Sequence, residues 1–320
     1  MSPRMTADAA SLLDELPHSE RIRSRRLKDG VVTIIADASG LSEKERSALE
    51  QELKSAALAV AGVNDARIAL TAAEPSRTLI AIGSGKGGVG KSTVAANVAV
   101  ALARMGKRVG LIDADVYGPS QPTLLGTDAK PEAADDRLIP VEAHGLKFLS
   151  LGQLVSPGHA LAWRGPMATG ALAKLIEADW GDAELLLVDL PPGTGDVQLS
   201  LIQRSRPAGA VIVSTPQDLS LIDARRAVDL FNKTSVPVLG IVENMATYVC
   251  PHCGEASHPF GTGGAEAAAA EMGVPFLGRL PLSLAVREAS DAGRPPAAGA
   301  GAEAEAFETI ARKLLEAVAH

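Results

Sequence analysis

Residues 85–93 read Gly-Lys-Gly-Gly-Val-Gly-Lys-Ser-Thr, which fits the phosphate-binding pattern G-x-x-x-x-G-K-[ST] with a second lysine after the first glycine. Glycines allow successive backbone N–H groups to curl around phosphates, Lys91 can reach the outer two phosphates, and the Ser92 hydroxyl can bind a magnesium ion. We therefore expect a nucleoside triphosphate here. The predicted contacts are Gly85, Lys86, Gly87, Gly88, Val89, Gly90, Lys91, Ser92 and Thr93.

The segments on either side of this loop supply the context that the pattern requires. Residues 78–82 (Thr-Leu-Ile-Ala-Ile) form an apolar run typical of a buried strand, and residues 91–105 are alanine-rich and favour a helix. A helix that begins at Lys91 directs its positive end toward bound phosphates. The sequence therefore predicts a strand, a phosphate-binding loop and a helix in that order.

Acidic residues follow two further apolar runs. Asp113 and Asp115 come directly after residues 109–112 (Val-Gly-Leu-Ile), and Asp189 follows residues 185–188 (Leu-Leu-Leu-Val). Open parallel sheets bind their ligands at the carboxyl edge, so these carboxylates are expected beside the phosphates. The residues predicted to bind magnesium are Ser92, Asp113, Asp115 and Asp189.

The predicted reaction is phosphoryl transfer from the nucleotide to water. This chemistry asks the protein to position the attacking water and to neutralise the charge that develops on the phosphate. Lysine ammonium groups and a magnesium ion supply positive charge, and one carboxylate can orient the water. We predict Lys86, Lys91 and Asp115 as the catalytic residues.

Residues 86–93 resemble the deviant Walker A loop of the superfamily that includes MinD, ParA, ArsA and the nitrogenase iron protein. The resemblance implies that Lys86 reaches across a dimer interface to the nucleotide of the other subunit, so that ATP joins two subunits face to face. It also implies that residues 113–115 belong to switch I and residues 189–196 to switch II. Such loops reorder when the terminal phosphate leaves.

The only two cysteines of the chain lie in one motif, Cys250-Pro251-His252-Cys253. A closed zinc site takes four ligands, and one chain supplies two thiolates here, with His252 between them and His258 nearby. A structural disulfide is disfavoured in a reducing cytosol, and a thioredoxin-like redox pair is disfavoured because no helix is predicted to begin at Cys250. In a dimer, two chains would supply four thiolates for one iron-sulfur cluster.

Several motifs together are similar to those of the Mrp/ApbC family of iron-sulfur cluster carrier ATPases, from about residue 78 to the C-terminus. Tyr117 departs from some relatives, which have cysteine at that position. Besides the phosphate loop and the cysteine pair, the motifs are residues 113–120 (Asp-Ala-Asp-Val-Tyr-Gly-Pro-Ser), 163–167 (Trp-Arg-Gly-Pro-Met), 189–196 (Asp-Leu-Pro-Pro-Gly-Thr-Gly-Asp) and 243–245 (Glu-Asn-Met).

This family resemblance implies a homodimer that carries a labile 4Fe-4S cluster on Cys250 and Cys253 of both chains. It implies that ATP binding and hydrolysis accompany delivery of the cluster to recipient apoproteins, with an iron-sulfur scaffold as a further partner. Asn244 matches the position where the wider superfamily contacts adenine, so we include it among the ATP-binding residues. The expected cofactors are ATP, Mg²⁺ and the 4Fe-4S cluster.

The composition of the chain bears on whether it binds nucleic acid or membranes and on where in the cell it is found. The 320 residues carry a formal net charge of −7 and 46% are apolar, which is ordinary for a soluble protein and argues against a general nucleic-acid role. The basic run at residues 21–28 is short and is interpreted as a solvated face. No apolar segment is long enough to span a bilayer, and no signal peptide is visible, so we expect a cytoplasmic protein without membrane or nucleic-acid partners.

Two domains are expected. Residues 1–73 are predicted to form a small α/β unit, with a helix at 41–61 that presents Leu49, Leu53 and Leu58 on its apolar side. This unit resembles a shortened assembly domain of the same family, and residues 74–77 are the predicted linker. Residues 78–320 are expected to form a P-loop ATPase domain, a doubly wound and mostly parallel sheet with helices on both faces. Its strands are predicted near Leu79, Val109, Phe148, Leu185, Val211, Val238 and Phe276.

Two alternatives from other functional classes stay open. One is a spatial organiser like MinD or ParA, which would need a basic amphipathic tail or a basic face; the last helix is a poor lipid anchor because its charges are largely acidic. The other is a regulatory ATPase whose dimer is held by zinc. Four thiolates suit zinc and iron-sulfur clusters alike, so the sequence does not separate the two.

Overall fold

The chain divides into two compact units, Met1–Ser76 and Arg77–His320. The computed structural model describes residues 13–14, 16–39, 41, 43–71, 77–134, 136–154 and 165–319. Most of the predicted linker, together with Trp163 and Arg164, lies outside these described residues. Over the described ranges, no helix combines the length and the apolar character needed to cross a membrane.

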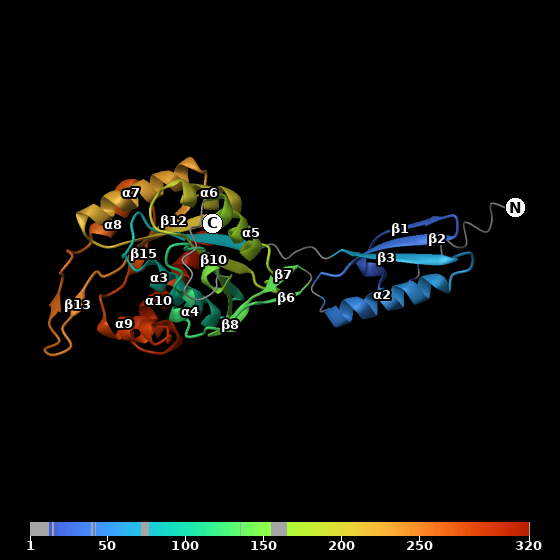
Figure 1. Ribbon diagram of the computed structural model, residues 1–320, viewed down its shortest axis with the longest axis horizontal. Helices are drawn as coiled ribbons and strands as arrows, with labels where there is room; N and C mark the ends of the chain where they lie inside the picture. Colours follow the sequence, from blue (N-terminus) through green and yellow to red (C-terminus); the bar gives the residue numbers. More distant parts are fainter. Residues whose placement is uncertain are drawn as a thin grey trace. The chain divides into compact units, whose positions relative to one another are not determined.

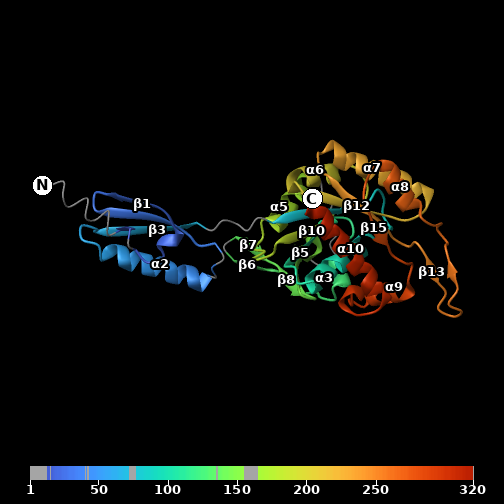
Figure 2. The same ribbon diagram turned by 180° about the vertical axis from the view of Figure 1, so that it is seen from behind.

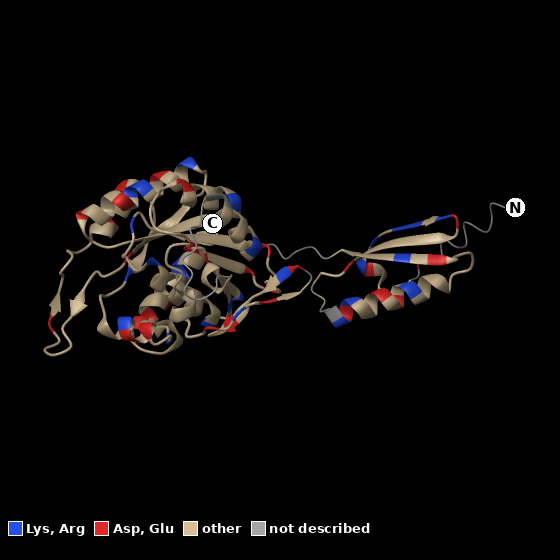
Figure 3. Cartoon of the chain, viewed as in Figure 1, with Lys and Arg blue, Asp and Glu red and all other residues tan. Residues whose placement is uncertain are grey.

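The first unit is a three-stranded sheet with one long helix, α2 (Glu43–Leu58). Strand β2 (Val31–Asp37) lies in the middle, antiparallel to β1 (Ile22–Lys28) and parallel to β3 (Asp65–Thr71). The basic run predicted as a solvated face forms β1, and most of its side chains are exposed; Figure 3 shows the basic residues along this strand. A short 3₁₀ turn, η1 (Ser19–Arg21), precedes it.

The apolar side of α2 differs from the prediction at one residue. Leu49 and Leu53 are buried in the core of this unit as predicted, but Leu58 is 44% exposed. Ala57 is buried in its place, because it lies four positions after Leu53 and so on the same face of the helix.

The second unit is built on an eight-stranded sheet in the order β15-β12-β11-β4-β10-β5-β9-β8. All neighbours are parallel except β8, which pairs antiparallel with β9, so the predicted mostly parallel, doubly wound sheet is confirmed. The strands are β4 (Thr78–Gly83), β5 (Val109–Asp113), β8 (Val141–Ala143), β9 (Leu146–Ser150), β10 (Leu185–Asp189), β11 (Gly209–Ser214), β12 (Val238–Glu243) and β15 (Phe276–Arg279).

Helices cover both faces of this sheet (Figures 1 and 2). Helices α3 and α10 share one apolar cluster with the sheet, and α5 to α8 share the other. Inner strands such as β10 read as continuous apolar runs because both of their faces are covered. The helices are α3 (Lys91–Arg104), α4 (Gln121–Leu124), α5 (Gly165–Ile176), α6 (Asp196–Ser205), α7 (Asp218–Lys233), α8 (Gly264–Met272), α9 (Leu284–Asp291) and α10 (Ala302–Val318), with 3₁₀ turns η2 (Leu151–Leu154) and η3 (Pro296–Ala298).

Two short hairpins and the last helix complete the unit. The hairpins are β6 (Glu132–Ala134) with β7 (Arg137–Ile139), and β13 (Tyr248–Val249) with β14 (Ala256–Ser257). In α10 the apolar residues Phe307, Ile310 and Leu314 are buried in the core. The apolar face of this helix is thus used for packing on the sheet.

Close packing against β5 generates a test of the core. A Cβ atom at Gly110 would lie 2.4 Å from Leu186 and 2.6 Å from the ring of Trp180, which is fully buried. Gly110→Ala should therefore lower the free energy of unfolding by about 1–3 kcal/mol. Both tryptophans of the chain belong to the second unit, so urea unfolding followed by tryptophan fluorescence reports this unit alone.

The matched control is Gly170→Ala, at an exposed position in α5 where an added Cβ atom meets nothing within 4 Å. Alanine favours a helix over glycine, so this variant should be as stable as the wild type or more stable. Equal stability of Gly110→Ala and the wild type would contradict the packing described for β5.

Candidate functional site

The phosphate loop joins β4 to α3, and its glycines are needed for both backbone and packing. Gly90 has a φ of 79°, a left-handed conformation that glycine adopts at least cost. A Cβ atom at Gly85 would lie 2.1 Å from the backbone oxygen of Asp223 in α7, so no side chain fits there. Helix α3 begins at Lys91, so the last three residues of the loop motif form its first turn, and their N–H groups are available to an anion.

Lys91 lies at the centre of the predicted site and is only 5% exposed. Its ammonium forms an ion pair with Asp189, lies 3.9 Å from an oxygen of Asp115 and donates a hydrogen bond of 3.3 Å to the Ser92 hydroxyl. The structure thus brings together residues predicted from three separate segments of sequence. A buried charge of this kind is tolerated because it is paired.

Asp113 and Asp189 end the neighbouring strands β5 and β10 and lie opposite each other in the sheet. Two residues that were not predicted hold these carboxylates. Gln121, at the start of α4, donates from its side chain to Asp189 (2.9 Å) and from its backbone to Asp113 (3.1 Å). Ser150, at the end of β9, donates to Asp113 at 2.8 Å. Ser150 could have been predicted from the sequence, because it ends the strand that follows β5 along the sheet.

Burial and the neighbouring carboxylate of Asp189 raise the pKa of Asp113 from 3.8 to about 7. The hydrogen bonds that Asp113 accepts from Gln121, Ser150 and Asp115 oppose this shift but do not cancel it. Without a divalent ion, the site therefore disfavours a second negative charge beside Asp189, even with Lys91 in place. A divalent ion bound here would relieve that repulsion.

Asp115 has one oxygen fixed and one oxygen directed toward the lysine. Its Oδ1 atom accepts hydrogen bonds from the backbone N–H groups of Tyr117 (3.0 Å) and Gly118 (3.2 Å). Its Oδ2 atom is the one that lies 3.9 Å from the Lys91 ammonium. The first contact sets the shape of the loop after β5, and the second leaves an oxygen facing the phosphate loop.

Lys86 and the loop after β10 flank the phosphate loop. Lys86 is partly exposed, and no described residue forms a hydrogen bond or an ion pair with its ammonium. The backbone N–H of Gly193 donates to the carbonyl of Ser84 at 3.0 Å, and this bond ties the loop after β10 to the phosphate loop.

Asn244 follows β12 and contacts the phosphate loop directly. Its side-chain amide donates to the carbonyl of Val89 at 2.9 Å. A cavity of about 310 Å³ lies beside it, bounded by the phosphate loop, the start of α3, α9 and the loop after β15. Its lining includes Gly90, Thr93, Asn244, Leu280, Pro281 and Phe307. A largely apolar cavity next to the phosphate loop suits a nucleotide base.

Cys250 and Cys253 are free thiols in the turn of the β13–β14 hairpin. The backbone N–H groups of Cys253 and His252 donate toward the sulfur of Cys250 and, with the Cys253 side chain, lower the pKa of the Cys250 thiol. The turn is closed by the N–H of Gly254, which donates to the Cys250 carbonyl at 2.9 Å. A thiolate stabilised by backbone donors is suited to bind a metal.

One chain does not complete a metal site at this hairpin. Across the described ranges, no three His, Cys, Asp or Glu side chains are grouped closely enough to hold a metal ion. The ring of His258, the nearby histidine, instead lies 3.1 Å from the carbonyl of Ala246 at the base of the hairpin. The two thiols therefore need ligands from elsewhere to make a closed site.

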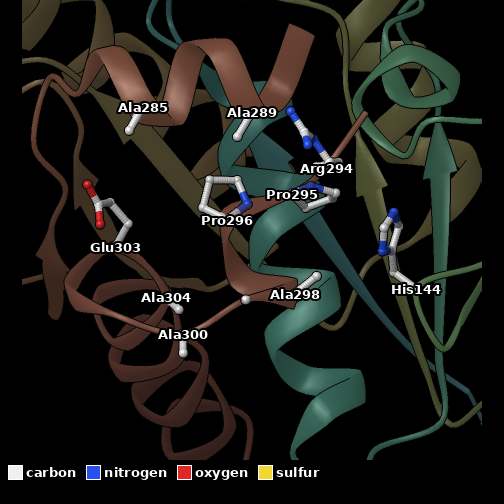
Figure 4. Close-up of a pocket in the computed structure, with 11 residues that line it drawn as sticks. His144, Ala285, Ala289, Arg294, Pro295, Pro296, Ala298, Ala300, Glu303 and Ala304 are labelled. Carbon is white, nitrogen blue, oxygen red and sulfur yellow. The ribbon is translucent and has the colours of Figure 1, made fainter. Parts of the chain in front are cut away.

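A second cavity of about 420 Å³ lies between α9, η3 and the start of α10 (Figure 4). Alanine and proline side chains form most of its wall, and Figure 4 shows Arg294 and Glu303 on opposite sides of it. None of the residues predicted from the sequence to bind nucleotide, magnesium or a cluster lines this cavity.

The doubly wound sheet with a phosphate loop after the inner strand β4 defines a P-loop NTPase of the MinD and ParA type. MinD of Pyrococcus furiosus has a similar fold, with a TM-score of 0.58 and 25% identity over 75% of this chain and 99% of that one. A nucleotide-binding protein of Archaeoglobus fulgidus, solved in complex with ADP, gives a TM-score of 0.61 and 42% identity over 68% of this chain and 87% of its own.

Within that class, the chain belongs to the family of NUBPL iron-transfer P-loop NTPases, which residues 76–315 match. The iron-sulfur cluster carrier protein of Pseudomonas fragi is 50% identical over 225 residues, or 69% of this chain and 78% of that protein. The iron-sulfur cluster carrier protein of Deinococcus radiodurans is 48% identical over 280 residues, covering 83% of this chain and 79% of the relative. The family expected from the sequence is confirmed.

The raised pKa of Asp113 generates a test of the carboxylate pair. As the pH rises above 3.8, the unfolded chain releases this proton first, while the folded protein keeps it until about pH 7. The folded state therefore loses stability over this interval, and Asp113→Asn does not share the loss. In EDTA without nucleotide, the stability of the variant relative to the wild type should rise by about 1–3 kcal/mol between pH 4 and pH 8.

Urea unfolding at several pH values measures this difference. The control is Asp182→Asn. This side chain is 69% exposed and lies before the amino end of β10, whereas Asp189 lies at its carboxyl end. A stability difference for Asp113→Asn that stays constant between pH 4 and pH 8 would contradict the burial of this carboxylate beside Asp189.

Proposed function

We propose that two copies of this chain form an ATP-hydrolysing carrier that holds one 4Fe-4S cluster between them and passes it to recipient apoproteins. The observation that carries the proposal is the pair of free thiols at Cys250 and Cys253, the first partly exposed and the second exposed. The hairpin that presents them begins four residues after Asn244, at the carboxyl edge of the sheet, which we call the nucleotide edge. Four thiolates complete a cluster of this type, and one chain supplies two.

In this proposal the phosphate loop binds ATP, and Lys91 neutralises charge on the outer phosphates. Binding would draw the Lys91 ammonium from Asp189 toward the nucleotide, since phosphates offer more negative charge than one carboxylate. Asn244 and the cavity beside it hold the adenine base. The free oxygen of Asp115 orients the attacking water, because it faces the phosphate loop while the other oxygen is fixed by the turn.

Magnesium fits the oxygen atoms at this edge. Ser92, Asp113, Asp115 and Asp189 offer the hydroxyl and carboxylate oxygens that Mg²⁺ prefers, and the repulsion between Asp113 and Asp189 favours a cation. When bound, the ion would neutralise negative charge on the phosphates. Gln121 and Ser150 would hold the carboxylates in orientation, since both donate to them in the protein.

Dimerisation through the nucleotide edge gives Lys86 its role. Its ammonium is available for an anion outside the chain, and the relatives named as iron-sulfur cluster carriers support a cluster as the cargo. Lys86 would reach the nucleotide of the partner subunit and stabilise the charge that develops during hydrolysis. The partners proposed for the dimer are an iron-sulfur scaffold and recipient apoproteins.

The cluster proposal is tested by anaerobic reconstitution with iron and sulfide, comparing the wild type with a Cys250→Ala/Cys253→Ala variant. We expect a visible absorption band from the wild type alone, and transfer of the cluster to an apo-acceptor that regains its own activity. The variant should keep its affinity for ATP, because neither cysteine lines the nucleotide cavity. Tight zinc binding by the wild type without a transferable cluster would favour the zinc-held dimer instead.

A second test concerns the extra lysine. Lys86→Ala should slow ATP hydrolysis by at least about tenfold while changing ATP affinity by less than about threefold, because the lost contact acts mainly on the transition state. Steady-state turnover and isothermal titration with Mg-ATP measure the two quantities. Lys107→Ala, at the amino end of β5, is the matched control and should behave as the wild type. Unchanged turnover in Lys86→Ala would contradict the proposed role.

A further inference from the structure

The hairpin that carries the cysteines is held at its base by the loop after β15. The chain leaves β12 at Glu243 and enters β13 at Tyr248. Between them, the N–H of Ala246 donates to the carbonyl of Leu280 at 2.9 Å, and the carbonyl of Thr247 accepts from the N–H of Leu282 at 2.7 Å. The first leg of the hairpin is therefore paired with residues 280–282.

The proposed base cavity is lined by residues 280–282 of this pairing and by the two residues that precede its other side. Asn244 and Met245 form one part of its wall, and residues 280–283 form another. Asn244 is in turn bonded to the carbonyl of Val89 in the phosphate loop. A base in this cavity would therefore contact residues 280–282, which hold the hairpin, and the residues directly before Ala246.

The returning leg is joined to the first leg through His258. Its Nδ1 atom lies 3.1 Å from the Ala246 carbonyl and 3.4 Å from the Thr247 hydroxyl. Strands β13 and β14 are only two residues long, and most of the residues at 249–259 are exposed. A hairpin this short has little intrinsic stability, so its orientation depends on the contacts at its base.

We propose that His258 is a positioning residue that couples occupancy of the base cavity by a purine nucleotide to the geometry of the Cys250–Cys253 turn. A bound base fixes the separation between residues 244–247 and 280–282, and His258 transmits that constraint to the returning leg. The inference deepens the proposed function, since it explains how the nucleotide would influence the cargo. Coupling of this kind is reciprocal. The factor by which the nucleotide changes the affinity of the thiols for a metal equals the factor by which the metal changes the affinity for the nucleotide.

The two thiols are themselves the probe, because the chain has no other cysteine. In reduced protein without metal, the rate of alkylation by monobromobimane should change by at least about fivefold when saturating Mg-ADP is added. His258→Ala should reduce this change to less than about twofold, while its affinity for ADP stays within about twofold of the wild type, since His258 does not line the cavity. A purely structural role would alter the alkylation rate equally with and without ADP.

Two further variants sharpen the test. His252→Ala removes a histidine that is closer to the thiols, and no described residue bonds to its ring, so this control should keep the response to ADP. His258→Asn places an amide donor near the position of Nδ1 and should restore part of the response. Tryptophan fluorescence confirms that each variant is folded.

Three results would overturn the inference. These are a wild-type alkylation rate that does not respond to Mg-ADP, a response in His258→Ala equal to that of the wild type, and a loss of ADP binding in His258→Ala. None of these measurements needs a cluster. A wild type that fails to bind a cluster would therefore overturn the proposed function alone, and a cluster-binding wild type without a thiol response would overturn this inference alone.

Discussion

The buried ion pair between Lys91 and Asp189 holds the nucleotide edge of this protein together. It joins the first residue of α3 to the last residue of β10, and Gln121 connects the same carboxylate to the loop after β5. A buried pair contributes to a fold only when its remaining hydrogen-bonding groups are satisfied, and here Gln121 donates to the other oxygen of Asp189. The catalytic geometry and the orientation of the flanking loops both depend on this network.

The cysteine hairpin is built in the opposite way. Its strands are two residues long, the thiol of Cys253 is exposed, and that of Cys250 is partly exposed. Its position derives from the loop after β15 and from His258, and the residues at its base also border the nucleotide cavity. A rigid phosphate loop and a lightly held pair of thiols would suit the proposed carrier, because a cargo that must leave is better held by ligands that can move.

Local patterns in the sequence were sufficient to predict the phosphate loop, the strands that end in Asp113 and Asp189, and the family. Each of these is contained in one continuous segment whose residue types have few structural alternatives. Gln121 and Ser150 were not predicted, because their roles depend on which strands become neighbours in the sheet. Leu58 was wrongly predicted to lie on the apolar face of α2. The neighbouring Ala57 is buried instead, and the sequence pattern alone did not distinguish these two adjacent apolar positions. The role proposed for the cysteines depends on a second chain, which no single sequence describes.

The central claim is that two chains share one cluster through their paired cysteines. Native mass spectrometry of the anaerobically reconstituted protein tests it most directly, since it reports subunits and metal in the same particle. We predict a dimer whose mass exceeds that of two chains by one cluster of about four irons and about four sulfides, with no cluster on monomers. A cluster on the monomer, or a dimer that contains zinc alone, would contradict the account.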